Sequence, residues 1–187
     1  MTVYLVRHAS AGVRNDRDPE DPHRGLDPTG HLQAEKLSEW LRHEPLTRIV
    51  SSPYERCFQT MEPLAKQLRI DVEVDERLAE STPVEDAWDL VAALADRTVA
   101  LCSHGDVIPD LVRRAQGRGM HVPGKSGCSK GSVWTLTGWD GQRFETVGGG
   151  DRPEPRPPQM RLQEEAEDGF VVHGEYGRGV HVDSPGL

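Results

Sequence analysis

Two histidines and two arginines occupy places from which they could act together on one phosphate group. Arg7 and His8 follow a short apolar run, TVYLV, and His104 follows another, TVALCS. Arg56 stands a few residues behind a third such run, TRIVSS. Because open α/β sheets bind their ligands where the strands end, these four side chains should face one crevice.

The four side chains suit phosphoryl transfer through a covalent intermediate. A guanidinium group matches phosphate oxygens in pairs and stays charged at any working pH, which suits Arg7 and Arg56. A neutral imidazole can attack phosphorus in line and form a phosphohistidine. A second, cationic histidine could stabilise the equatorial oxygens in the transition state, and helix N-termini behind Ser52 and His104 would add N–H donors.

A metal centre is the competing chemical interpretation of the same residues. Arginines at its middle would repel a cation, and neither a His-x-x-x-His pair nor a carboxylate cluster accompanies the histidines. The sequence therefore predicts phosphate chemistry with no metal and no cofactor.

A second phosphate-binding pattern lies elsewhere in the chain. GMHVPGKS (residues 119–126) matches the Gly-x-x-x-x-Gly-Lys-Ser pattern of a nucleotide-binding P-loop. Such a loop must leave a buried strand and lead into a helix, whose N-terminus receives the phosphates. Here the segment follows an expected helix and leads through a turn into an expected strand. We therefore interpret it as a connecting loop, in which Lys125 binds no phosphate.

Alternating strands and helices are expected to position the candidate residues. Apolar, β-branched runs predict strands over residues 2–6, 47–52, 72–75 and 97–103. Helical spacing of apolar residues and helix-start signals predict helices over residues 28–43, 52–68, 83–95 and 105–117. Asp27 is the expected N-cap of the first helix, and Ser52 with Glu55 forms the expected capping box of the second.

The order of these elements predicts the fold class. SVWTLTG (132–138) and RFETV (143–147), joined by an Asp-Gly turn, read as a hairpin. Strands and helices that alternate before a hairpin predict a three-layer α/β/α domain, with a mainly parallel sheet and an antiparallel edge. GGGDRPEPRPPQ then has the composition of a linker. We expect a catalytic domain over residues 1–147, and a linker with an acidic tail over 148–187 that is disordered or laid over the domain.

The overall composition excludes several classes of protein. The chain has 187 residues and a formal net charge of −9, whereas nucleic-acid-binding domains usually have a basic excess. Its apolar runs are too short to cross a bilayer, and its start, MTVYLVRHA, lacks a basic leader and a cleavage site. Three cysteines without a C-x-x-C pair fit reduced thiols. We expect a cytoplasmic protein that binds neither nucleic acid nor membranes; the sequence does not define its oligomeric state.

Several motifs together resemble those of the histidine phosphatase superfamily, the phosphoglycerate-mutase-like fold. They are VRHAS, LDPTGHLQA, SSPYERCFQT, RLAE and CSHGD, and the resemblance covers residues 2 to about 147. The resemblance implies that His8 carries the phosphoryl group, and that Arg7, Arg56 and His104 complete the phosphate pocket. It also implies that Glu80, in the RLAE stretch, protonates the leaving group.

The chain departs from the sugar-phosphate mutases of this family at two places. Their Arg-His-Gly-x-Thr-x-x-Asn motif has Ala9 here in place of the glycine and Arg14 in place of the asparagine. The Gly-x-x-Glu-Gly that normally follows the Glu80 stretch is also missing. Both differences argue against a glycolytic mutase. The RHAS opening is similar to that of small bacterial phosphohistidine phosphatases, and RHASAG, HGDVIPDL and KGSVW resemble the phosphatase domain at the C-terminus of some Nudix hydrolases.

Some assignments stay open at this level. Arg14, Arg24 and Gly105 are candidates for substrate binding, although both arginines could equally be surface charges. Asp106 is an alternative general acid to Glu80, because some relatives use a His-Asp pair. Lys130 fits a turn cap better than a substrate contact.

The sequence predicts a metal-independent phosphoric monoester hydrolase that works through a phosphohistidine on His8. The expected substrate is a small phosphate ester or a nucleotide. A phosphorylated protein histidine is the alternative substrate, and a phosphate-binding module without catalysis is the alternative function.

Overall fold

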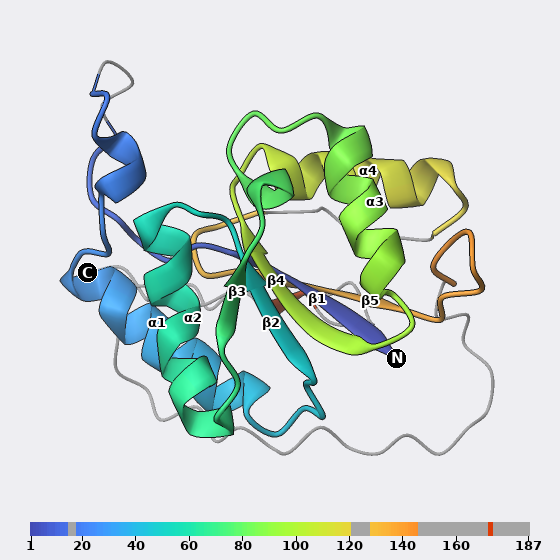
Figure 1. The fold of residues 1–187 in the computed structure, drawn as a ribbon, viewed down its shortest axis with the longest axis horizontal. Coiled ribbons are helices and arrows are strands. Elements are labelled where there is room, and N and C mark those ends of the chain that lie inside the picture. The colour runs from blue at the N-terminus through green and yellow to red at the C-terminus, as the bar shows by residue number, and fades with distance from the viewer. Residues whose placement is uncertain (15–17, 121–127, 146–171, 174–187) are drawn as a thin grey trace, which may run out of the picture.

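A mixed β-sheet runs through the middle of the molecule (Figure 1). The computed structural model describes residues 1–14, 18–120, 128–145 and 172–173. Within them the strands lie in the order β3-β2-β4-β1-β5-β6. The first four of these are mutually parallel, β5 is antiparallel to β1, and β6 is parallel to β5. The strands are β1 (Thr2–Arg7), β2 (Arg48–Ser51), β3 (Val72–Val74), β4 (Thr98–Ser103), β5 (Val133–Thr137) and β6 (Val172–His173).

Helices cover both faces of the sheet. α1 and α2 pack together on one face, and α3 and α4 lie on the other (Figure 1). The α-helices of the described residues are α1 (Pro28–Leu41), α2 (Glu55–Leu68), α3 (Val84–Leu94) and α4 (Val107–Gly117). Two short 3-10 helices, η1 (Asp21–His23) and η2 (Glu76–Leu78), lie in the connections. The predicted three-layer α/β/α class is therefore confirmed.

The side chains of the strands divide the core into two apolar layers. In β1, Val3 and Leu5 pack with α3 and α4, whereas Tyr4 and Val6 pack with α1 and α2. This alternation follows from the two-residue period of a strand. With both faces buried, β2, β4 and β1 form a fixed platform in which the strands end side by side.

The register of this platform brings separate segments of the chain together. Arg7 pairs with Ser103, and Cys102 pairs with Ser51. The residues that follow these strand ends, His8, His104 and Ser52, therefore leave the sheet at one edge.

The expected start of α1 is confirmed and that of α2 is wrong. The Asp27 side chain accepts a hydrogen bond from the backbone N–H of Gly30 at 2.7 Å and caps α1. In contrast, α2 begins at Glu55 and has no side-chain cap. The hydroxyl of Ser52 lies 2.8 Å from Nε2 of His104 and accepts the backbone N–H of Tyr54 at 3.3 Å. Ser52 therefore holds the turn before α2 and the imidazole of His104, and the helix begins after that turn.

The expected hairpin is confirmed in part. The backbone N–H of Glu145 donates to the oxygen of Gly138 at 2.8 Å, but the described part of the second arm forms no regular strand, and residues 146–147 lie outside the described residues. Gly138 has a φ of +67°, which ends the extended backbone of β5. Beyond it, Trp139 and Phe144 form an isolated bridge, and their rings pack with centroids 4.8 Å apart. The turn itself is present, because the carboxylate of Asp140 accepts backbone N–H bonds within it.

The P-loop-like segment connects α4 to the part of the chain before β5. α4 ends at Gly117, and β5 begins at Val133. Lys125 and Ser126 lie outside the described residues. The segment therefore follows a helix, not a strand, as the sequence predicted.

The division of the chain at residue 147 stays a prediction. Within the predicted tail, the structure describes Val172–His173, which pairs with Val133 and Trp134 of β5. Among the described residues, no helix combines the length and apolar character needed to cross a bilayer.

Candidate active site

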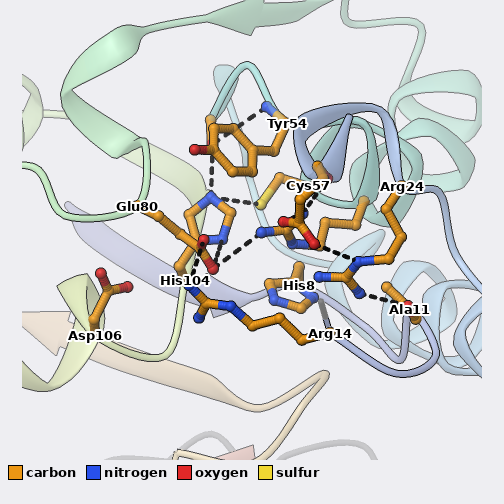
Figure 2. A network of polar contacts seen from close by, with 12 residues as sticks. His8, Ala11, Arg14, Arg24, Tyr54, Cys57, Glu80, His104 and Asp106 are labelled. Carbon is orange, nitrogen blue, oxygen red and sulfur yellow. Dashed lines mark hydrogen bonds and ion pairs between the residues drawn. The ribbon is translucent and has the colours of Figure 1, made fainter. Parts of the chain in front are cut away.

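Five predicted site residues meet at the carboxyl end of the platform. Figure 2 shows His8, His104 and Glu80 close together. The carboxylate of Glu80 also lies 2.9 Å from Nη2 of the buried Arg56. The two histidine rings are 5.4 Å apart between centroids. Arg7 comes from the end of β1, Arg56 from the first turn of α2, and Glu80 from the segment behind η2.

His8 is held as a neutral imidazole with one defined tautomer. Its Nδ1 lies 2.7 Å from the backbone oxygen of Ala9. Because a carbonyl oxygen can only accept, Nδ1 has the proton and Nε2 presents a lone pair. Burial lowers the pKa of His8 to about 3 against the effect of the Ala9 bond, and the charges of Arg56 and Arg7 lower it further.

Arg7 lies against the backbone of the β4–α4 connection. Its guanidinium donates to the backbone oxygen of Cys128. A side chain at Gly105 would place its Cβ 2.6 Å from Cζ of Arg7, so this close approach requires glycine. The structure therefore places Gly105 beneath an arginine of the pocket. Nε of Arg7 is buried without a hydrogen-bond partner in the protein.

Arg56 is fully buried and is held by two carboxylates. Its Nη1 lies 3.0 Å from Oδ2 of Asp21 and donates to the backbone oxygen of the same residue. Its Nη2 lies 2.9 Å from Oε1 of Glu80. The ring of Tyr54 lies beneath the guanidinium, 4.6 Å from Cζ to the ring centroid. A guanidinium with two carboxylates has a fixed orientation before any ligand binds.

His104 is fully buried between Ser52 and Glu80. Its Nε2 is 2.8 Å from Oγ of Ser52 and 3.5 Å from Sγ of Cys57, and its Nδ1 is 3.4 Å from Oε1 of Glu80. Burial, together with the nearby charges of Arg56 and Arg7, lowers the pKa of His104 to about 2. In this arrangement His104 is neutral, whereas the sequence-based mechanism used a cation.

The structure separates the two candidate acids. Glu80 lies within the cluster, with Oε1 near Arg56 and His104 and Oε2 3.5 Å from Nη2 of Arg14. Asp106 stands apart from His8 in Figure 2, and its Oδ2 accepts the backbone N–H of Ser81 at 2.8 Å.

Three further cations surround the loop behind β1, and we call them the rim. Arg24 donates to the backbone oxygen of Ala11, and Lys130 lies 3.4 Å from that of Gly12. Arg14 belongs to the loop and has a side chain that is 59% exposed. Burial, and next the charge of Arg7, lower the pKa of Lys130. Cations close enough to repel one another create a positive potential, which favours an anionic ligand.

Sequence reasoning missed four residues of this site or its support. Sequence analysis assigned no role to Asp21 or Tyr54. It predicted a helix cap for Ser52 and a turn cap for Lys130. Asp21 also binds Nε of Arg24 at 2.8 Å, and this hydrogen bond is the main cause of its lowered pKa. Its loop has no periodicity that could have indicated the contact. For Tyr54, by contrast, its place two residues before Arg56 was an available signal.

Metal-ligating clusters were also sought in the described ranges. No group of three or more His, Cys, Asp or Glu side chains there has an arrangement that could hold a metal ion.

Comparison with known sequences indicates the family. The histidine phosphatase superfamily (branch 1) matches residues 3–85, a range that includes Arg7, His8 and Arg56. An 8-oxo-(d)GTP phosphatase of Mycolicibacterium smegmatis is 34% identical over 146 residues. The match covers 75% of this chain and 45% of that protein, so the chain spans about half the length of this curated relative.

Solved structures share the fold. A protein from Agrobacterium tumefaciens described as a candidate SixA phosphohistidine phosphatase is 25% identical, with a TM-score of 0.61 over 72% of this chain and 90% of that one. The mycobacterial glucosyl-3-phosphoglycerate phosphatase Rv2419c is 21% identical, with a TM-score of 0.62 over 77% of this chain and 95% of that one. The chain belongs to the histidine phosphatase superfamily. Its family and named relatives support a phosphohydrolase.

Proposed function

We propose that this protein hydrolyses a small phosphate ester or nucleotide through a phosphohistidine on His8, without a metal or a cofactor. The tautomer of His8 is the observation on which the proposal rests. With Nδ1 donating to Ala9, the Nε2 lone pair is free to attack, and a pKa of about 3 keeps it unprotonated at neutral pH.

In the first step, Nε2 of His8 attacks phosphorus in line and forms an N–P bond. The bond from phosphorus to the leaving oxygen breaks, and that oxygen takes a proton from the Glu80 carboxyl group. Arg7 and Arg56 bind the equatorial oxygens, where charge is redistributed in the transition state.

In the second step, water attacks the phosphohistidine. The Glu80 carboxylate removes a proton from the water, the N–P bond breaks, and inorganic phosphate leaves. His8 returns to the neutral form with Nδ1 still protonated, and Glu80 is again the acid for the next turnover.

His104 acquires its role only with the substrate. Its pKa is low because burial and nearby cations disfavour a further charge. A phosphoryl dianion beside it would reverse the sign of this local field and favour the imidazolium. His104 can then donate to a phosphoryl oxygen, while Ser52 fixes the position of its Nε2.

The rim and Glu80 favour a nucleotide or alkyl ester over phosphohistidine. An alkoxide leaving group needs protonation, whereas imidazole leaves readily, so a placed carboxyl group is of most use with esters. Further cations outside the centre suit a substrate with more negative charge than one phosphoryl group. The M. smegmatis relative, named an 8-oxo-(d)GTP phosphatase, supports the same substrate class.

Phosphohistidine in a protein is the second candidate substrate. The 25% identity to the candidate SixA protein supports it. Phosphate release from nucleotides, sugar phosphates and a phosphohistidine protein, measured side by side, separates the two. Binding without release from any of them would favour the non-catalytic module.

The test of the acid uses Glu80→Gln and two esters of different leaving group. The value of kcat/KM reports formation of the phosphohistidine and not the later attack of water, so it isolates the acid role of Glu80. For a nucleoside 5′-monophosphate kcat/KM should fall about 10²- to 10⁴-fold, because its alkoxide needs the proton. For p-nitrophenyl phosphate kcat/KM should change little. Equal losses of kcat/KM on both esters would show that Glu80 is not the acid and would favour the phosphohistidine substrate.

A further inference from the structure

The segment that contains Glu80 is attached at two points to the chain on either side of His104. Before Glu80, the backbone oxygen of Leu78 accepts from Oγ of Ser103 at 2.7 Å. After it, the backbone N–H of Ser81 donates to Oδ2 of Asp106 at 2.8 Å. Ser103 is the last residue of β4, and Asp106 stands directly before α4. The distance between Glu80 and His104 thus depends on these two hydrogen bonds.

The second attachment holds a backbone that would not otherwise be favoured. Ser81 has a φ of +62°, in the left-handed region that residues with a side chain seldom occupy. Such a conformation persists where neighbouring contacts determine it. The hydrogen bond from Ser81 to Asp106 is such a contact.

Asp106 uses its carboxylate for this contact rather than for its own helix. It stands at the N-cap position of α4, where an aspartate commonly accepts a helix N–H, yet its side chain makes no capping bond. Figure 2 shows its carboxylate away from His8, with Glu80 reaching into the cluster. Asp106 thus forms a hydrogen bond to the segment that contains Glu80, the proposed acid, but does not itself lie among the reacting groups.

We propose that Asp106 is a positioning residue that holds Glu80 in place for proton transfer. The proposal rests on the proposed role of Glu80 as the general acid. Because Asp106 acts only through Glu80, its loss should slow formation of the phosphohistidine only where the leaving group needs a proton.

Two variants at this position and one on α4 test the proposal. Asp106→Ala should lower kcat/KM for a nucleoside 5′-monophosphate about 10- to 100-fold, the size expected when a catalytic group is misplaced. It should change kcat/KM for p-nitrophenyl phosphate less than about 2-fold. Asp106→Asn keeps an oxygen that can accept from Ser81 and should restore most of the activity. Asp110→Ala, which removes another exposed carboxylate of α4, should have no effect.

A double variant tests whether Asp106 acts through Glu80. Asp106→Ala combined with Glu80→Gln should be no slower on the monophosphate than Glu80→Gln alone, because the acid is already lost. Since Asp106 is exposed, its replacement leaves the core intact, which the thermal midpoints of the variants will check.

The outcomes separate this proposal from the proposed function. If Glu80→Gln shows the leaving-group dependence and Asp106→Ala does not, the positioning role alone is wrong. An Asp106→Asn variant as slow as Asp106→Ala would make Asp106 itself the acid. If Glu80→Gln slows both esters equally, the role of Glu80 fails and the positioning role fails with it.

Discussion

Both the centre of the pocket and its rim contain cationic side chains, but these side chains have different surroundings. The centre consists of the five predicted residues Arg7, His8, Arg56, Glu80 and His104. In the centre, Arg56 is fully buried and His8 is 5% exposed. In the rim, the side chains of Arg14 and Arg24 are 59% and 21% exposed. Two carboxylates orient the central arginine. Arg24 shares one of them, Asp21, and Arg24 and Lys130 also bind carbonyl oxygens of the loop behind β1.

This difference predicts separate tasks. Charges removed from water interact several-fold more strongly than exposed ones, and salt screens them less. The centre should therefore determine the chemical step for every substrate. The rim should adjust how well a highly charged substrate binds, and its effect should weaken with salt.

Loss of the central arginine should give the largest effect. Arg56→Ala removes a preorganised donor to the phosphoryl oxygens, and kcat should fall at least about 10²- to 10³-fold on every substrate. Steady-state rates on a nucleoside monophosphate and on p-nitrophenyl phosphate will measure it. Arg113→Ala, an exposed arginine of α4, is the control. A loss below 10-fold would show that Arg56 does not stabilise the transferring phosphoryl group.

The buried histidines should make folding stability depend on pH. The pKa of His8 is about 3 in the folded chain, below the usual 6.5, so the unfolded chain binds the proton more readily. Stability is then complete above about pH 6.5 and is lost as the pH falls towards 3. Between pH 7 and 5 the loss for this histidine should be on the order of 2 kcal/mol.

Urea denaturation at the two pH values measures this contribution. His8→Gln should reduce the acid-induced loss of stability, whereas His23→Gln, at a side chain that is 78% exposed, should leave it unchanged. The same pH dependence in the wild-type protein and in His8→Gln would contradict the burial of a neutral His8.

Loss of a rim cation should give a smaller effect that salt reduces. Lys130→Gln should lower kcat/KM for a nucleoside monophosphate about 3- to 10-fold at low ionic strength, the equivalent of roughly 1 kcal/mol. The loss should shrink at high ionic strength, whereas that of Arg56→Ala should persist. A Lys130 effect as large and as salt-independent as that of Arg56 would place Lys130 in the centre.

The smallest effect should come from the P-loop-like segment. Lys125→Ala should leave kcat/KM within about 2-fold of the wild type, because the segment follows a helix instead of a strand. A loss comparable to that of Arg56→Ala would reopen the nucleotide-binding interpretation of GMHVPGKS.

The sequence predicted the central residues of the pocket better than the residues that hold them in place. His8 and His104 follow apolar runs, and the ends of parallel strands meet at one edge, so their proximity follows from fold class alone. Asp21 and Ser81 lie in irregular connections, where no periodicity indicates which side chain they contact. Ser52 matched a capping box, a pattern that involves only neighbouring residues. Its hydrogen bond to His104 joins residues far apart in the chain, which no local pattern indicates.

The same limit applies to the edge of the sheet. β1, β2 and β4 were predicted because buried parallel strands read as apolar runs. Phe144 fitted a strand by its neighbours in sequence, yet it packs against Trp139 after Gly138 has ended the strand. Tertiary packing decided between two conformations that the local sequence permitted.

Trapping of the phosphoenzyme tests the central claim most directly. The enzyme is mixed with a ³²P-labelled nucleoside 5′-monophosphate, with and without a chelator, quenched, and its bound label is followed in acid and in alkali. A phosphohistidine should lose the label in acid and keep it in alkali, the chelator should change nothing, and His8→Ala should bind none. Label that survives in acid, or that persists in His8→Ala, would contradict a phosphohistidine at His8.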